Sequence, residues 1–160
     1  MLALLLLAPA CSGDGDGGDS ATPGPSAGSP TRKTGLALTA GSARLVLKGG
    51  VSAQADLSLD AAGSQFNPAP GGFALFWRAG TNLLSMGGPH FTGTRKTSKE
   101  LALGFSIAQG ETLHTHTSND GGCSITLRQQ GSAVDGSFTC ADVRSSEGAR
   151  YSAEGTFQAR

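Results

Sequence analysis

The chain has few charged residues, few aromatic residues and no excess of either charge. Of its 160 residues, 15% are charged and 6% aromatic, and 12 basic side chains balance 12 acidic ones. Such a balance gives no long-range attraction to nucleic acid, to an anionic membrane surface or to a polyanionic substrate. Arg95, Lys96 and Lys99 form the only local basic cluster, which is typical of a solvated loop. We therefore expect no nucleic-acid partner.

Recognisable catalytic and nucleotide-binding motifs are also missing. From Gly35 onward the chain holds no Gly-x-Ser-x-Gly segment, which marks a serine nucleophile on a strand-to-helix turn. No glycine-rich phosphate loop opens a helix, and the acidic residues mostly alternate with apolar ones, as solvent-facing residues of strands do. The sequence predicts a protein that is not an enzyme and uses no cofactor.

Helical periodicity and internal repeats are absent, whereas period-two alternation is frequent. Short alternating runs end in Gly, Pro, Asn and Asp clusters, which is typical of antiparallel strands. Segments 66–72 and 92–99 read as connections, and Trp77 is expected at the centre of the core. About nine or ten strands predict an all-β fold, an antiparallel β-sandwich with a closed β-barrel as second choice. The expected strands lie at 36–38, 44–48, 53–60, 73–77, 83–86, 100–107, 111–117, 123–128, 134–140 and 151–159.

Cysteine is scarce, and two of the three cysteines flank one predicted hairpin. A turn centred on residues 130–133 places Ile125 opposite Phe138 and Cys123 opposite Cys140. Directly opposed residues of a non-hydrogen-bonded antiparallel pair have Cα atoms about 4.5 Å apart, within the range of a disulfide. The hairpin therefore predicts a disulfide and an oxidising compartment, with two buried free thiols as the alternative.

The chain begins with MLALLLLAPA, an apolar run too short to span a bilayer, which takes about 20 residues. Its length suits the apolar region of a secretion signal. The stretch Leu7-Ala8-Pro9-Ala10-Cys11 resembles the lipobox of bacterial lipoproteins, where the signal is cleaved before a cysteine that is then acylated. The resemblance implies a signal peptide at 1–10, a lipid anchor on Cys11 and an extracytoplasmic location. The alternative is an apolar N-terminus on a cytosolic protein.

Residues 12–34 contain no large apolar side chain and consist mainly of Gly, Ser, Pro, Asp and Thr. Such a segment cannot be buried, so it is expected to be a disordered tether. The expected organisation is therefore a signal peptide at 1–10, an acylated cysteine and tether at 11–34, and a β-sandwich domain at 35–160. This layout is similar to that of actinobacterial envelope lipoproteins. It implies a lipid-anchored, non-enzymatic binding or structural module whose partner is an envelope protein.

Two alternative functions rest on particular side chains. His114 and His116 lie two apart on one strand and could share a metal ion, with His90 as a third ligand. Because Leu113 marks the opposite face as the core face, both histidines are expected to face water. The other alternative is a carrier that holds an apolar small molecule in a pocket. Its expected lining is aromatic: Phe73, Trp77, Phe91 and Phe105.

Overall fold

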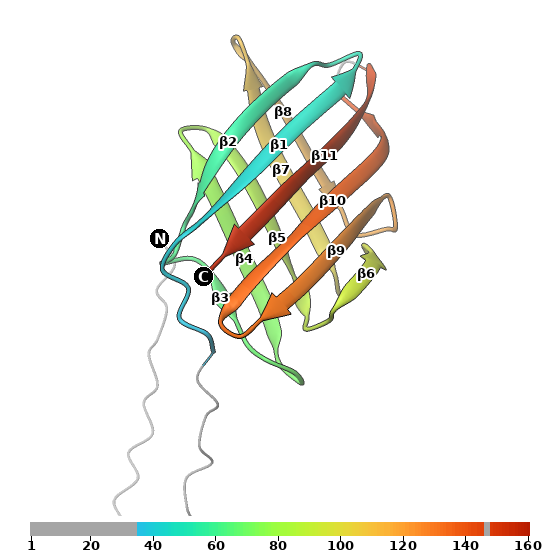
Figure 1. Cartoon of the computed structure of the whole chain (residues 1–160). Coiled ribbons are helices and arrows are strands. Elements are labelled where there is room, and N and C mark those ends of the chain that lie inside the picture. The colour runs from blue at the N-terminus through green and yellow to red at the C-terminus, as the bar shows by residue number, and fades with distance from the viewer. Residues whose placement is uncertain (1–34, 146–147) are drawn as a thin grey trace, which may run out of the picture. The chain divides into compact units, whose positions relative to one another are not determined.

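The computed structural model describes residues 35–145 and 148–160, and this part of the chain is all-β (Figure 1). It contains eleven antiparallel strands and no helix, which confirms the predicted class. The number exceeds the nine or ten expected, although the expected strand at 36–38 forms only an isolated bridge between Leu36 and Phe66. The predicted signal peptide, Cys11 and the tether lie outside the described residues. The strands are β1 (Gly41–Gly49), β2 (Ala53–Leu59), β3 (Gln65–Phe66), β4 (Gly72–Ala79), β5 (Asn82–Pro89), β6 (Gly93–Lys96), β7 (Ala102–Gln109), β8 (Thr112–Ser118), β9 (Cys123–Gln130), β10 (Ala133–Arg144) and β11 (Arg150–Ala159).

The strands form one sheet that folds over on itself. Their order is β6-β9-β10-β11-β1-β2-β4-β5-β7-β8, and β3 pairs with β4 beside this path. In Figure 1 the layer β2-β1-β11-β10-β9 lies in front of the layer β4-β5-β7-β8. The described end strands β6 and β8 share no ladder, so the sheet is not the closed barrel given as second choice. The fold is sandwich-like, with two layers enclosing one core.

The core is formed by the inward-facing side chains of each strand, which alternate with outward-facing ones. Buried apolar side chains come from both layers, and Trp77, Leu45, Leu103 and Ile125 are among those fully enclosed. The Trp77 indole Nε1 donates a hydrogen bond to the Gln158 carbonyl oxygen at 3.2 Å, so its one polar atom is satisfied. The predicted central position of Trp77 is therefore confirmed.

Two glycines allow aromatic rings to lie flat over the neighbouring strand. Gly136 lies opposite Phe157, and Gly155 lies opposite Phe138, in the β10–β11 ladder. A Cβ atom at Gly155 would lie 2.6 Å from the Phe138 ring and 2.1 Å from the Arg44 carbonyl oxygen. One at Gly136 would lie 2.5 Å from the Phe157 ring. Each ring thus covers the glycine of the opposite strand, which fixes the register of the two strands.

The hairpin of β9 and β10 has the predicted register and its disulfide. Ile125 lies opposite Phe138, and Cys123 lies opposite Cys140 with a Cα–Cα distance of 4.1 Å and an S–S distance of 2.01 Å. Gly131 supplies a positive φ of 60° in the turn, a conformation that glycine adopts at little cost. The prediction from alternation alone is confirmed here.

Two strands overlap segments expected to be connections: β3 begins one residue before the segment 66–72, and β6 lies inside the segment 92–99. β3 has only two residues, too few to show alternation, and pairs with β4 through Gln65 and Phe66. All four residues of β6 are exposed, so this strand has no apolar face, and it pairs with β9. Both strands form through backbone pairing, which hydrophobic periodicity does not reveal.

The first long strand and the last one are neighbours in the sheet. β1 pairs with β11 along its whole length, from Gly41 opposite Ala159 to Gly49 opposite Tyr151. Beyond this ladder, Arg160 donates its backbone N–H to the Ala40 carbonyl oxygen, and the Thr39 and Ala40 N–H groups donate to the Arg160 carbonyl oxygen. The start and end of the folded chain are therefore fastened side by side.

Candidate functional site

The predicted histidine pair lies on the inner face of β8, so the expectation that it faces water is wrong. His114 is 9% exposed and His116 is half-buried, whereas Leu113 is 49% exposed. Within the described sheet β8 pairs with β7 alone, where His116 lies opposite Phe105 and His114 opposite Ile107. Residues that lie opposite each other in a ladder point to the same face of the sheet. The buried apolar residues of β7 therefore determine which face of β8 points inward, and Leu113 is left on the outer face.

Tyr151 of β11 packs against His114 and Phe105 from the other layer. Its ring centroid lies 6.4 Å from that of His114 and 6.5 Å from that of Phe105, and its hydroxyl is buried without a hydrogen-bond partner in the described part of the chain. Burial raises the pKa of Tyr151. Burial also lowers the pKa of His116, against a smaller opposing effect of the Asp120 carboxylate. Both groups are therefore held in their uncharged forms near neutral pH.

A short polar network joins the ends of β6 and β8. The Thr97 and Ser118 hydroxyl groups lie 2.7 Å apart, and Ser118 donates to the Asp120 carboxylate at 3.1 Å. The Gly122 N–H donates to the same carboxylate at 3.1 Å, and these two bonds hold the pKa of Asp120 below its usual value. The network satisfies the buried hydroxyl groups and so has a structural role.

His90 lies far from the other two histidines. It is hydrogen-bonded to Gln129 of β9 at 2.9 Å. Gln129 lies opposite Val134 of β10, and Val134 lies opposite Ala159, the last residue of β11. Tyr151, which contacts His114, is at the other end of β11, and eight residues of strand span roughly 26 Å. Among the described residues no group of three His, Cys, Asp or Glu side chains is arranged to hold a metal ion. The three predicted ligands are therefore not brought together.

The four aromatic residues of the predicted pocket all lie in the core. Each is at most 4% exposed: Phe73, Trp77, Phe91 and Phe105. Their rings pack on other core rings at centroid distances of 5.4 to 6.5 Å. They fill space between the layers, and none of them lines the surface hollow that follows.

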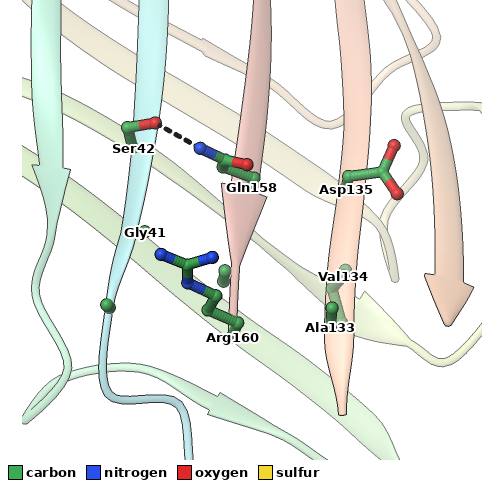
Figure 2. A pocket seen from close by; sticks show the side chains of 9 residues that line it. Gly41, Ser42, Ala133, Val134, Asp135, Gln158 and Arg160 are labelled. Carbon is green, nitrogen blue, oxygen red and sulfur yellow. Dashed lines mark hydrogen bonds between the residues drawn. The ribbon is translucent and has the colours of Figure 1, made fainter. Parts of the chain in front are cut away.

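A large hollow lies on the outer face of the front layer, along β11 between β1 and β10. We call it the β11 groove. A volume of 580 Å³ near Arg160 shares lining residues with a hollow of 490 Å³, which in turn shares lining residues with a third hollow of 290 Å³. Figure 2 shows its first part, where the Gln158 amide donates to the Ser42 hydroxyl at 3.0 Å. Its outward side chains are Ser42, Arg44, Val46, Asp56, Arg128, Asp135, Ser137, Thr139, Glu154, Thr156, Gln158 and Arg160.

Cross-strand register arranges these side chains in rows. The row through Gln158 contains Ser42, Asp135 and Arg128, and the next row contains Asp56, Arg44, Thr156 and Ser137. In the second row the small side chains of Thr156 and Ser137 lie beside the long side chain of Arg44, and all three line the hollow. The groove therefore combines hydroxyl, amide, guanidinium and carboxylate groups over one flat sheet face.

Charges in the groove are largely balanced. Arg128 donates to the Asp135 carboxylate through Nε at 2.9 Å and through Nη2 at 2.6 Å, and Arg44 donates to the Gln54 amide oxygen at 3.0 Å. Exposed pairs of this kind contribute little to stability, at most about 1 kcal/mol each. They leave a surface rich in donors and acceptors without a strong net charge. The described lining of the groove includes no imidazole and no thiol.

The sequence alone does not reveal this groove. Its outward residues read as solvent-facing residues of separate strands, and Ser42 and Gln158 lie 116 positions apart. The only signal was the excess of Ser, Thr and Gln over Lys and Glu on the strands that form it.

No helix in the described ranges is long and apolar enough to cross a membrane. Comparisons of the chain with protein-family models, with curated proteins and with solved structures find no match.

Proposed function

We propose that this chain is an envelope protein, anchored by a lipid on Cys11 at the extracytoplasmic side of a membrane, whose sandwich acts as a non-enzymatic binding module. The observation that carries the location is the Cys123–Cys140 disulfide, because disulfides persist in oxidising compartments and are rare in the cytosol. The lipobox-like stretch before Cys11 supports the same location.

The β11 groove is the surface that we assign to binding. Its volume falls in the range of small-ligand sites, roughly 300 to 1,000 Å³. Its lining offers hydroxyl and amide groups beside paired charges, so the ligand it fits is polar and without net charge, such as an envelope glycan. Ordinary ligand sites are mostly apolar, whereas this one would recognise its ligand through hydrogen bonds.

Fractionation of cells that express the full chain tests the location. The parent chain is expected in the membrane fraction, labelled by radioactive palmitate, and Cys11→Ala is expected to lose the label and the processing of the signal. Ser12→Ala is the matched control and should behave as the parent does. The location is wrong if Cys11→Ala remains as membrane-bound and as palmitate-labelled as the parent.

Titration of the isotope-labelled full chain tests the groove by NMR. With a soluble N-acetylated oligosaccharide we expect amide shifts in β1, β10 and β11, and their loss in Gln158→Ala. Thr117→Ala, on the outer face of the other layer, should keep them. If palmitic acid instead shifts residues around Trp77 and Phe105, and no oligosaccharide shifts the groove, the carrier function replaces this proposal.

A further inference from the structure

The outer face of the back layer carries no charge over most of its described area. β5, β7 and β8 contain no Asp, Glu, Lys or Arg, and their outward side chains are small or apolar. Among the described residues of this face, the one charged side chain is Arg78 near the end of β4, which pairs with Asp60 at 3.2 Å. The outer face of the front layer, by contrast, carries the charges of the β11 groove. We call the back-layer surface the uncharged face.

In one cross-strand row of the uncharged face, an aromatic side chain and a glycine lie on opposite sides of Ser85. Phe76 lies opposite Ser85, Ser85 opposite Gly104, and Gly104 opposite Thr117. Phe76 is partly exposed, and a hollow of 190 Å³ lies beside it over Gly87 and Gly104. Phe76 and Gly104 are therefore one strand away from Ser85 in opposite directions, and the hollow extends between them over β5.

We propose that the uncharged face binds the same face of a second copy of this chain, around a two-fold axis that lies between the copies, parallel to β5 and above Ser85. Such an axis exchanges β4 and β7, so it places Phe76 of each copy over Gly104 of the other. Both contacts form at once, as a symmetric interface of identical patches requires. Among the described residues of the face only Arg78 is charged, and it is paired with Asp60, so pairing buries little charge, as is typical of interface cores.

The area of the face predicts a weak dimer. Four strands spaced about 4.8 Å apart and about seven residues long cover roughly 400 Å² per copy. A standard stable interface covers about 800 Å² per partner. The pair therefore dissociates at low concentration and is best detected by trapping it chemically.

Cross-linking of the purified full chain tests the proposal. Ser85→Cys lies beneath the proposed axis, and Ser137→Cys, on the outer face of the front layer, is the matched control. With a short thiol-reactive cross-linker we expect at least several-fold more dimer from Ser85→Cys than from Ser137→Cys. Adding Phe76→Arg to Ser85→Cys should return the yield to that of the control.

Sedimentation equilibrium of the unsubstituted chain provides a second readout. We expect the mass to rise toward that of a dimer with concentration, and Phe76→Arg to remain monomeric with an unchanged near-ultraviolet circular dichroism spectrum. Equal cross-linking from the two faces, or a monomer at every concentration together with no Ser85→Cys dimer, overturns the proposal. Dimerisation that survives Phe76→Arg would place the interface elsewhere.

Discussion

Single residues fix the β10–β11 register, and Gly155 is the clearest example. The Phe138 ring and the Arg44 carbonyl oxygen occupy the space that a Cβ atom would need there. Gly155→Ala should lower the free energy of unfolding by about 1 to 3 kcal/mol, because a backbone carbonyl cannot yield as a flexible side chain can. Urea denaturation measures this change.

Gly63→Ala is the control for that substitution. Gly63 lies in an exposed turn, and a Cβ atom added to it would meet the Asp60 carboxylate first, at 3.3 Å, which is the end of a side chain that can move. The control should change stability by less than about 0.5 kcal/mol. Equal effects of the two substitutions would show that the ring over Gly155 does not constrain the strand.

His116 makes stability depend on pH through its burial. Its pKa is lowered in the folded state, so the unfolded chain binds the proton more readily. The stabilisation is complete above the unfolded pKa of about 6.5 and is lost as pH falls through the folded value. The free energy of unfolding should therefore decrease in mild acid, and His116→Gln should remove part of that decrease.

Thermal unfolding at several pH values measures this dependence. Thr115→Gln, which alters the neighbouring outward position on β8, should retain the slope of the parent chain. An identical slope in the parent and in His116→Gln would mean that the imidazole titrates equally in folded and unfolded chains.

At the scale of elements, the hairpin of β9 and β10 depends on its disulfide. Closing the loop between Cys123 and Cys140, a separation of 17 residues, stabilises the fold by about 3 kcal/mol in the chain-entropy model. Replacing both cysteines by alanine should lower the free energy of unfolding by a similar amount. A reductant should destabilise the parent to the same extent and leave the double variant unchanged. A reductant effect on the double variant would point to another redox-sensitive group.

Elements with a strong alternating pattern were predictable, and those defined by their neighbours were not. The β9–β10 hairpin carries both its apolar face and its turn in one local stretch, so its register and disulfide followed from sequence. β8 has a single leucine among threonines and histidines, and its ladder to β7 set its orientation instead. The β11 groove could not be predicted from the sequence for the same reason, because residues from β1, β10 and β11 come together only through the register of the folded sheet.

For the whole molecule, the last strand completes the sheet. β11 lies between β10 and β1, so without it the hydrogen-bonded path divides into β6-β9-β10 and the remaining strands. Deleting residues 150–160 should abolish cooperative unfolding altogether. Neither of the two remaining groups of strands would keep a complete front layer to cover the core. Deleting Arg160 alone, the control, should retain the transition. A truncated chain that still unfolds in one sharp transition would show that the two parts are independent.

The pairing of β1 with β11 also has a mechanical consequence. A pull transmitted through Ala40 runs along β1, which is held by β11 on one side and by β2 on the other. Force in that direction shears both ladders, so their hydrogen bonds bear the load together, whereas a hairpin peeled from its open end separates one pair at a time. Tension applied along β1 is therefore resisted by two ladders at once.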